Sequence, residues 1–396
     1  MVQGASAALY SSPATTVVFT TVLTQGPVSR ADVSRRTGLS SAAVTKAVRP
    51  LIDAGYLVEL PDSRVEPGIG RPASPLQVRA DRGFFGGVKL TGDELIGVVT
   101  DLQARTKAVS RLALPSQRVD DVVETVRDAV GGLLAQAPHF GARARAIGVA
   151  ISGDVDGQIG LVRYSPFLGW RDVELARLIR AATGLATVVE NDVRALTLAE
   201  QWFGAGVGLS SFALVTVGAG IGCGLYVNGA VVSGAHGVAG EIGHLPVDPD
   251  GPPCHCGSRG CVEALASERA IIDQVCAATG VQGIGIDDAI ELARSGERAA
   301  RQVFSRAGRT IGLALASVAN LLGPERIIIS GEGLAAYDLF EDQMRETFST
   351  QAFGASSGCE IIVCPLPFEE WARGAAAVAI RSLVTPASLS RLVIPS

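Results

Sequence analysis

Three cysteines and one histidine lie close enough in the sequence to bind one metal ion. Cys254, Cys256 and Cys261 fall within eight residues, and His244 lies ten positions before the first of them. Three thiolates and one imidazole are a ligand set of closed tetrahedral zinc sites. Reduced thiols without a metal are the alternative, but the prolines and glycines around the cysteines favour a turn shaped around an ion. We therefore expect a structural zinc ion held by His244, Cys254, Cys256 and Cys261.

Two acidic residues flank this cluster and could bind a ligand beside it. Glu241 lies three residues before His244, and Glu263 lies two residues after Cys261, so a bound metal would keep both carboxylates near its loop. If His244 binds the ion through one ring nitrogen, its other nitrogen can contact a ligand hydroxyl. The expected zinc ion would then orient a binding pocket.

A second group of polar residues ends an expected strand. Residues 186–190 form this strand, which leads into Asn191 and Asp192. Ligands of α/β sheets bind at the carboxyl ends of strands. Asp192 could act as a base toward a hydroxyl group, and Asn191 could both donate and accept hydrogen bonds. An equally supported alternative is that these residues only cap the helix expected over 193–203.

A glycine-rich segment follows another apolar strand. Residues 212–217 are expected to form the strand, and residues 218–224 contain four glycines. Such segments let backbone N–H groups approach a phosphate, but they also form tight hairpins. Because residues 225–232 supply a second strand, a hairpin is at least as well supported as a phosphate site.

The elements that position these residues indicate α/β layering. From Phe84 onward, strands alternate with helices, which is typical of α/β folds. We expect strands over 95–100, 146–152, 186–190 and 212–217, helices over 119–137, 173–182 and 193–203, and a C-terminal helix over 371–383 that packs back on the first lobe.

The first 80 residues have a different pattern, with three short helices followed by the start of a hairpin. Two helices joined by a tight turn at Gly38 indicate a helix-turn-helix, whose second helix enters the major groove of DNA. Residues 61–75, rich in Pro, Gly and Arg, fit a wing between two strands. A protein-interaction or dimerisation module is the alternative. The residues expected to contact DNA are Ser41, Thr45, Lys46 and Arg49 on the helix and Arg64 and Arg71 on the wing.

Length, composition and charge exclude several classes of protein. The chain has 396 residues, enough for two or three domains, and no apolar stretch long enough to span a bilayer. Its N-terminus lacks the basic region of a secretory signal, and its seven cysteines do not form a secreted disulfide framework, so we expect a cytoplasmic protein. The net charge of −5 divides into +3 for residues 1–80 and −8 for the remainder. This division permits a nucleic-acid-binding head on an acidic body.

The motifs together resemble those of the ROK family of repressors, open reading frames and sugar kinases. The stretch Val217 to His244 is similar to the family signature through Gly218, Gly220, Gly222, Gly224, Gly234, Gly240, Gly243 and His244. Cys254-His-Cys-Gly-Ser-Arg-Gly-Cys-Val-Glu263 is similar to its zinc loop. Val189-Glu-Asn-Asp192, Leu168-Gly-Trp170 and Ile327-Ile-Ile-Ser-Gly-Glu-Gly333 extend the resemblance over residues 81–396. The resemblance implies an actin-like (ribonuclease-H-like) α/β fold of two lobes with a sugar in the cleft. It also implies that the sugar is contacted by Asn191, Asp192, Glu241, His244 and Glu263.

The domain boundaries expected from this resemblance are 1–80 for a winged helix-turn-helix, 81–192 with 371–396 for the first lobe, and 193–370 for the second. Kinase members of the family carry an Asp that serves the metal and phosphates of ATP, and Lys89 falls at that position here. An ammonium group cannot bind magnesium. Ala219 stands where the second phosphate turn of the kinases usually has a hydroxyl residue. Both departures affect the nucleotide side and favour an inactive sensor.

We therefore expect a sugar-responsive transcriptional regulator, most simply a repressor, that binds operator DNA and a sugar or sugar phosphate as a homodimer or homotetramer. An ATP-dependent hexose kinase with an attached DNA-binding head is the first alternative, with Asp192 as its base. A docking platform without a small ligand is the second.

Overall fold

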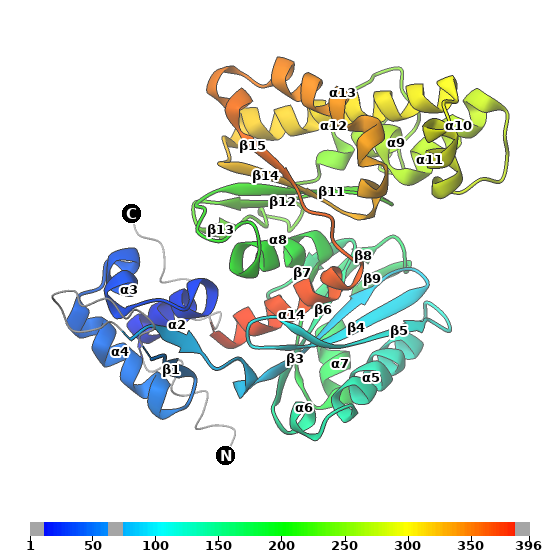
Figure 1. Ribbon diagram of the computed structural model, residues 1–396. Helices are drawn as coiled ribbons and strands as arrows, with labels where there is room; N and C mark the ends of the chain where they lie inside the picture. Colours follow the sequence, from blue (N-terminus) through cyan, green and yellow to red (C-terminus); the bar gives the residue numbers. More distant parts are fainter. Residues whose placement is uncertain (1–11, 62–73, 385–396) are drawn as a thin grey trace. The chain divides into compact units, whose positions relative to one another are not determined.

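A computed structural model describes residues 12–61 and 74–384 of the chain, which divides into two compact units (Figure 1). Unit 1 contains the residues up to Gly208 together with those from Trp371 onward, and unit 2 is Leu209–Glu370. The sequence predicted the boundary between the lobes after Asp192, earlier than the structure has it. The helix that follows Asp192 belongs to unit 1 because its Ala195 packs in a buried cluster with Ala150 and Ala375.

Unit 1 begins with three short helices that surround an apolar core. The helices are α2 (Pro13–Gln25), α3 (Arg30–Thr37) and α4 (Ser41–Asp53). Each is preceded by a serine whose hydroxyl accepts a hydrogen bond from a first-turn backbone N–H, and these serines are Ser12, Ser29 and Ser40. Such caps satisfy backbone donors that the helix itself leaves free. The head predicted over residues 1–80 therefore contains the expected helices.

Two short strands complete this head. β1 (Leu57–Glu59) and β2 (Leu76–Val78) are antiparallel, with Leu57 opposite Val78. The wing predicted between them lies largely in 62–73, so Arg64 and Arg71 fall outside the described residues. The helical part and the strand pair thus have the expected order, whereas the wing tip stays a prediction.

The main sheet of unit 1 has the strand order β10-β6-β3-β4-β5. β3, β4 and β5 form an antiparallel meander, and β6 and β10 add to its other side as parallel strands. The strands are β3 (Phe84–Leu90), β4 (Glu94–Asp101), β5 (Thr106–Ala113), β6 (Ala144–Ile151) and β10 (Ala186–Asn191).

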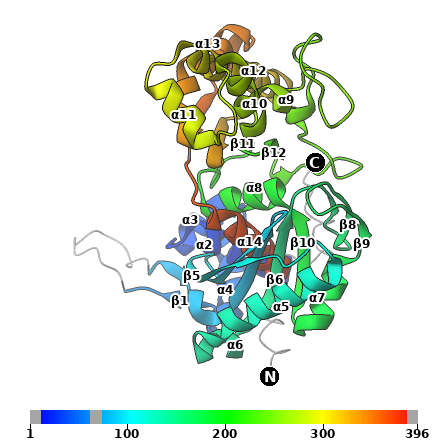
Figure 2. The same cartoon turned by 90° about the vertical axis from the view of Figure 1, so that its right-hand side faces the viewer.

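Helices cover both faces of this sheet (Figure 2). α5 (Val119–Ala135) and α7 (Leu175–Thr183) bury apolar side chains against residues such as Val88 and Val149. On the other face, α14 (Glu369–Val384) approaches so closely that a Cβ atom at Gly87 or Gly148 would lie about 2 Å from its backbone carbonyl oxygens. The two glycines are opposite each other in neighbouring strands, so together they make room for the returning helix.

Unit 2 repeats the topology of the first sheet. Its strand order is β13-β12-β11-β14-β15, in which the first three strands in chain order are again an antiparallel meander and the last two are parallel additions. This duplicated order confirms the predicted actin-like class. The strands are β11 (Phe212–Val217), β12 (Ile221–Val227), β13 (Ala230–Val231), β14 (Arg326–Ser330) and β15 (Glu360–Val363).

The helices of unit 2 bury one large apolar cluster against its sheet. Phe304 and Ile311 on the longest helix and Phe340 and Met344 on the next are among its fully buried members. The helices are α9 (Val262–Ala266), α10 (Glu268–Thr279), α11 (Ile286–Arg294), α12 (Arg298–Leu322) and α13 (Tyr337–Gln351).

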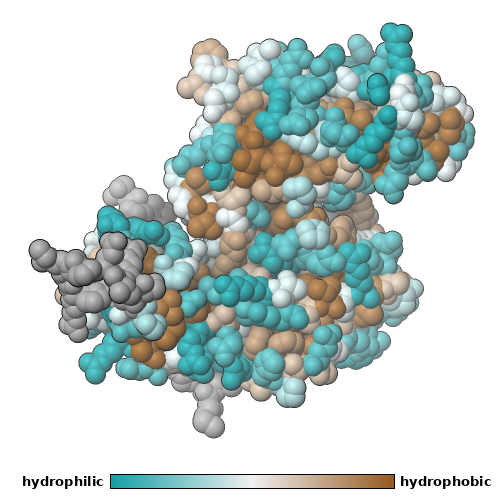
Figure 3. All heavy atoms as spheres, in the orientation of Figure 1, coloured by the Kyte–Doolittle hydropathy of each residue, from teal (hydrophilic) through white to brown (hydrophobic). Residues whose placement is uncertain are grey.

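The remaining elements connect these layers. In unit 1 they are η1 (Ala80–Arg82), α6 (Pro138–Ala142), the three-stranded sheet of β7 (Asp154–Asp156), β8 (Leu161–Ser165) and β9 (Trp170–Val173), and α8 (Asp192–Phe203). In unit 2 they are η2 (Ile242–His244), η3 (Glu332–Ala336) and η4 (Gly354–Gly358). Hydrophilic residues are spread over both units on the face shown in Figure 3, between smaller groups of hydrophobic ones. Within the described ranges, none of the helices has both the length and the apolar character needed to cross a bilayer.

Candidate metal and ligand sites

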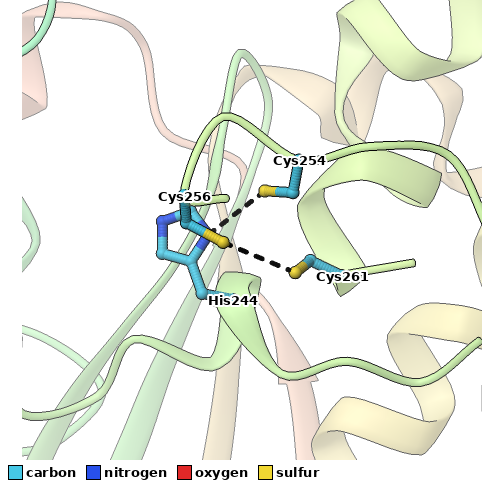
Figure 4. Close-up of side chains that lie close together, drawn as sticks. All are labelled: His244, Cys254, Cys256 and Cys261. Atoms are coloured by element: carbon cyan, nitrogen blue, oxygen red, sulfur yellow. Dashed lines mark hydrogen bonds between the residues drawn. The ribbon is translucent and has the colours of Figure 1, made fainter. Parts of the chain in front are cut away.

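The four predicted metal ligands meet at one point in unit 2 (Figure 4). Their ligand atoms all lie within 4.8 Å of one another. Cys256 Sγ is 3.7 Å from Cys261 Sγ, and Cys254 Sγ is 3.6 Å from His244 Nδ1. Zn–S bonds of about 2.3 Å in a tetrahedron put neighbouring sulfur atoms about 3.8 Å apart. The spacing of the cluster is therefore consistent with a zinc site.

Tight backbone turns bring these ligands together. η2 carries His244, and bridges between Pro246 and Cys261 and between Pro253 and Arg259 fold the following loop back on itself. Gly260 has a φ of 59°, and a Cβ atom there would lie 1.6 Å from the carbonyl oxygen of Asp248. Only glycine fits this approach, so the loop geometry depends on that residue.

Burial and hydrogen bonds within the loop set the acidity of the three thiols of this cluster. Burial raises the pKa of the Cys254 thiol and raises that of Cys261 to about 12. A hydrogen bond from the backbone of Ser258 lowers the pKa of Cys256 to about 7. Since metal ligation requires thiolates, an ion must displace two tightly held protons and would supply positive charge in their place.

A carboxylate and a second imidazole lie beside His244. Glu263 Oε1 is 2.8 Å from Nε2 of His255, and the ligand atoms of His244, His255 and Glu263 lie within 4.8 Å of one another. Glu241 directly precedes η2, and its backbone carbonyl oxygen accepts a hydrogen bond from the backbone N–H of His244. The side chain of Glu263 thus lies with those of the cluster, whereas Glu241 contacts His244 through a backbone hydrogen bond. His255 was missed in the sequence, although its place between two cysteines was a usable signal.

The corresponding polar group in unit 1 is a buried ion pair. Lys89 and Asp192 form a salt bridge with side chains only 6% and 9% exposed. Nζ of Lys89 also lies 3.1 Å from Ser152 Oγ and 5.2 Å from the ring centre of Trp371, and the Ser152 hydroxyl donates to Asp192. The sequence identified both charges but not their contact. A lysine in the fully buried strand β3 signals that a partner is needed.

This ion pair changes the chemistry of the Asp192 carboxylate. Burial acts to raise its pKa, but the charge of Lys89 and hydrogen bonds from Lys89 and Ser152 outweigh burial and lower the pKa. The other carboxylate oxygen accepts from the backbone N–H of Val193 at 2.9 Å. A carboxylate with a lowered pKa is a weak base, so this arrangement suits hydrogen bonding better than proton abstraction.

Asn191 has the capping role that the sequence left open. It is the N-cap of α8, where its Oδ1 accepts from the backbone of Arg194 at 3.1 Å. Its Nδ2 donates to the carbonyl oxygen of Gly153 at 3.1 Å. One amide hydrogen and one lone pair stay available for a ligand. Asn191 and Asp192 belong to unit 1, whereas Glu241, His244 and Glu263 belong to unit 2.

The glycine-rich segment forms the hairpin turn between β11 and β12. These strands are antiparallel from Phe212–Tyr226 to Val217–Ile221. At the turn, the backbone N–H of Ala219 donates to Glu332 Oε1 at 3.2 Å. A backbone donor that could face a phosphate is thus taken by a carboxylate of the chain itself. Glu332 was quoted in the sequence motif, but its contact with the turn was not foreseen.

The helix residues predicted to contact DNA share one exposed face. Ser41, Thr45, Lys46 and Arg49 are all exposed on α4 and line the same shallow surface hollow. The opposite face buries Val44, Val48 and Leu51. The apolar spacing of the sequence therefore fixes which face of α4 is free.

A duplicated α/β sheet with these site residues defines a protein of the two-lobe sugar-kinase class with a helix-turn-helix head. The ROK family profile matches residues 85–382, so the chain belongs to the ROK family. It is 31% identical over 339 residues to the DNA-binding transcriptional dual regulator NagC of Escherichia coli, and the match covers 83% of each chain.

Two solved structures separate the branches of this family. The crystal structure of a ROK family transcriptional regulator, a homolog of the Escherichia coli MLC protein, matches with a TM-score of 0.78 at 29% identity, covering 93% of this chain and 96% of that one. A ROK family glucokinase from Streptomyces griseus, in complex with glucose and AMPPNP, matches with a TM-score of 0.65 at 29% identity, covering 75% and 99%. The glucokinase thus leaves a quarter of this chain unmatched, and the chain lies in the transcriptional-regulator branch.

Proposed function

We propose that this protein is a sugar-responsive transcriptional repressor of the cytoplasm whose kinase-like body binds a sugar without phosphorylating it. The observation that carries the proposal is the buried contact between Lys89 and Asp192. An internal ammonium group lies on the carboxylate that would serve as the base of a kinase, and it stands at the position expected for a metal-binding Asp. The residues expected for sugar recognition are present, whereas the nucleotide side departs from the kinase pattern at Lys89 and Ala219.

The sugar is contacted by Asn191, Asp192, Glu241, His244 and Glu263 in this proposal. Carboxylates accept hydrogen bonds from sugar hydroxyls, and an amide can both donate and accept. Zinc is the ion held by His244 and the three cysteines, and it fixes the ring of His244 through Nδ1 so that the other ring nitrogen faces a ligand. Removing zinc would therefore weaken sugar binding as well as the fold of the loop.

Operator DNA is bound through the exposed face of α4. Ser41, Thr45, Lys46 and Arg49 supply hydrogen-bond donors and positive charge, and Arg64 and Arg71 of the wing add further cations. A homodimer or homotetramer presents paired heads to a two-fold-symmetric site. For sugar to act as a switch, it need only favour one arrangement of the heads by about 1 to 3 kcal/mol.

Selection of genomic fragments on the zinc-loaded protein, with and without a panel of sugars and sugar phosphates, tests this function. We expect the retained fragments to be enriched in one two-fold-symmetric DNA site. One sugar of the panel should abolish or increase this enrichment. Arg49→Ala should weaken binding to all fragments alike if Arg49 contacts phosphate, and should relax one base position if it contacts a base. Arg127→Ala, which removes an exposed arginine from α5 outside the head, is the matched control. Absence of any enriched site at low and moderate salt would overturn the proposal.

A further inference from the structure

Unit 2 contains an apolar cavity beside the glycine turn, lined by none of the residues assigned above to zinc, sugar or DNA. Its volume is about 190 Å³. An apolar cavity of roughly 150 Å³ is large enough to hold benzene. The cavity therefore has room for one aromatic ring.

The walls of this cavity come from four helices and the turn. Ile271 of α10, Ile290 of α11, Phe304 of α12 and Phe340 of α13 line it, together with Gly218 of the turn. Each of these four apolar residues is at most 5% exposed, so the wall is part of the packed core. A ring placed here would contact apolar atoms on several sides.

The charged residues that line the cavity, in the described part of the chain, are all acidic. They are Glu268, Asp287 and Glu332. Burial raises the pKa of Glu268, and the nearby charges of Glu332 and Asp287 raise it further. Arg294 donates to the carbonyl oxygen of the wall residue Ala335, but its guanidinium is paired with Asp338. The negative charges of these three carboxylates thus repel one another. A positive charge placed among them would stabilise their ionised forms.

An anionic ligand is disfavoured at the same place. Glu332 Oε1 accepts from the backbone N–H of Ala219, and a Cβ atom at Gly218 would lie 2.4 Å from the Glu332 carboxylate. The carboxylate therefore lies directly on the turn. It occupies the backbone donor that a phosphate would need, and its charge opposes any phosphate that approaches.

We propose that this cavity binds a small organic cation, a primary ammonium group attached to one apolar ring. The ring fills the cavity and the ammonium group lies among Glu268, Asp287 and Glu332. This inference goes beyond the proposed function, because the ligand is neither sugar nor nucleotide. The cavity wall includes Ala266, the last residue of α9. This helix also carries Glu263 and begins directly after Cys261, so it connects the cavity to the cysteine cluster.

Titration calorimetry of the full-length, zinc-loaded protein with 2-phenylethylamine tests the proposal. The neutral 2-phenylethanol and the anionic 3-phenylpropanoate are probes of similar size. We expect saturable binding of the amine, weaker binding of the alcohol and none of the carboxylate. Equal affinity for amine and alcohol, binding of the carboxylate, or no binding of the amine would overturn it.

Charge variants locate the site without disturbing the core. Glu332→Gln and Glu268→Gln should each weaken amine binding about two- to fivefold, as expected for single exposed or half-exposed ion pairs. Both variants should leave binding of the alcohol unchanged. Glu346→Gln, an exposed acid on α13 outside the cavity, is the control and should leave amine affinity as in the wild type. Equal effects of all three variants would mean that the amine responds only to net charge, which would contradict the proposed site.

Discussion

The two units contain polar clusters of opposite kinds. In unit 1, Lys89, Asp192 and Ser152 satisfy one another, because a positive charge of the chain lies against the negative one. In unit 2, His244 and three cysteines bring four potential metal ligands together within 4.8 Å of one another. The first cluster is neutralised within the protein, whereas the second has the composition of a zinc site. A fold with two copies of one sheet order thus holds one internally neutralised site and one site consistent with metal binding.

The largest expected effect comes from breaking the cluster of unit 2. Cys261→Ser should lower the free energy of unfolding by more than about 4 kcal/mol, because it removes both a metal ligand and the ion that folds the loop. Thermal unfolding with and without a chelator measures this loss. Cys276→Ser, on α10 outside the cluster, is the control and should change little. Chelator-insensitive unfolding of the wild type would show that no metal stabilises the loop.

Breaking the cluster of unit 1 should be nearly as harmful. Lys89→Met leaves the buried Asp192 carboxylate without its cationic partner, which typically costs about 3 to 5 kcal/mol. Denaturant unfolding of the purified variant measures the loss. Adding Asp192→Asn to Lys89→Met removes the unpaired charge and should restore a large part of the stability. A double variant no more stable than the single one would contradict the electrostatic explanation.

The pH dependence of these variants sharpens the comparison. Because the folded pKa of Asp192 is lowered in the wild type, its stabilising contribution is present above the unfolded pKa of about 3.9 and is lost as pH falls through the lower folded value. In Lys89→Met the pKa should instead be raised by burial, so acid relieves the penalty. We expect the stability gap between wild type and Lys89→Met to be smaller at pH 4.5 than at pH 7. A gap that is constant over this range would argue against the buried charge.

The smallest expected effect is on phosphoryl transfer. Wild type should release ADP at the background rate with every sugar of the panel, and Asp192→Asn should not differ from it. A coupled ADP-release assay makes this measurement, with a ROK glucokinase as the positive control. Sugar-dependent turnover that disappears in Asp192→Asn would support the kinase alternative.

Local signals in the sequence were sufficient for elements and for the metal cluster. The break at Gly38 indicated two of the three head helices, and short ligand spacing located the cysteine loop. The boundary between the lobes was misplaced because the packing of Ala195 against Ala375 depends on a helix nearly two hundred residues later. The same limit explains why Lys89 was read as a lost ligand rather than as the partner of Asp192, and why Glu332 was not linked to Ala219.

The duplicated strand order shows the same difference between local and distant information. Several strands are visible as apolar runs, such as those expected over 146–152 and 212–217, but the order in a sheet depends on pairings such as β3 with β6 or β11 with β14. Such pairings are not encoded in any one window of the chain. The resemblance to the ROK family, not the strand pattern itself, supplied the actin-like class at that level.

The central claim is that a sugar bound by the body controls DNA binding by the head. The most direct test is fluorescence anisotropy of a selected operator fragment, titrated with the zinc-loaded protein and then with the effector sugar, for wild type and Glu263→Gln. We predict that both proteins bind the fragment alike without sugar, and that the sugar concentration needed for the response rises at least tenfold in the variant. A sugar response unchanged by Glu263→Gln, or no response of the wild type to any sugar of the panel, would contradict the claim.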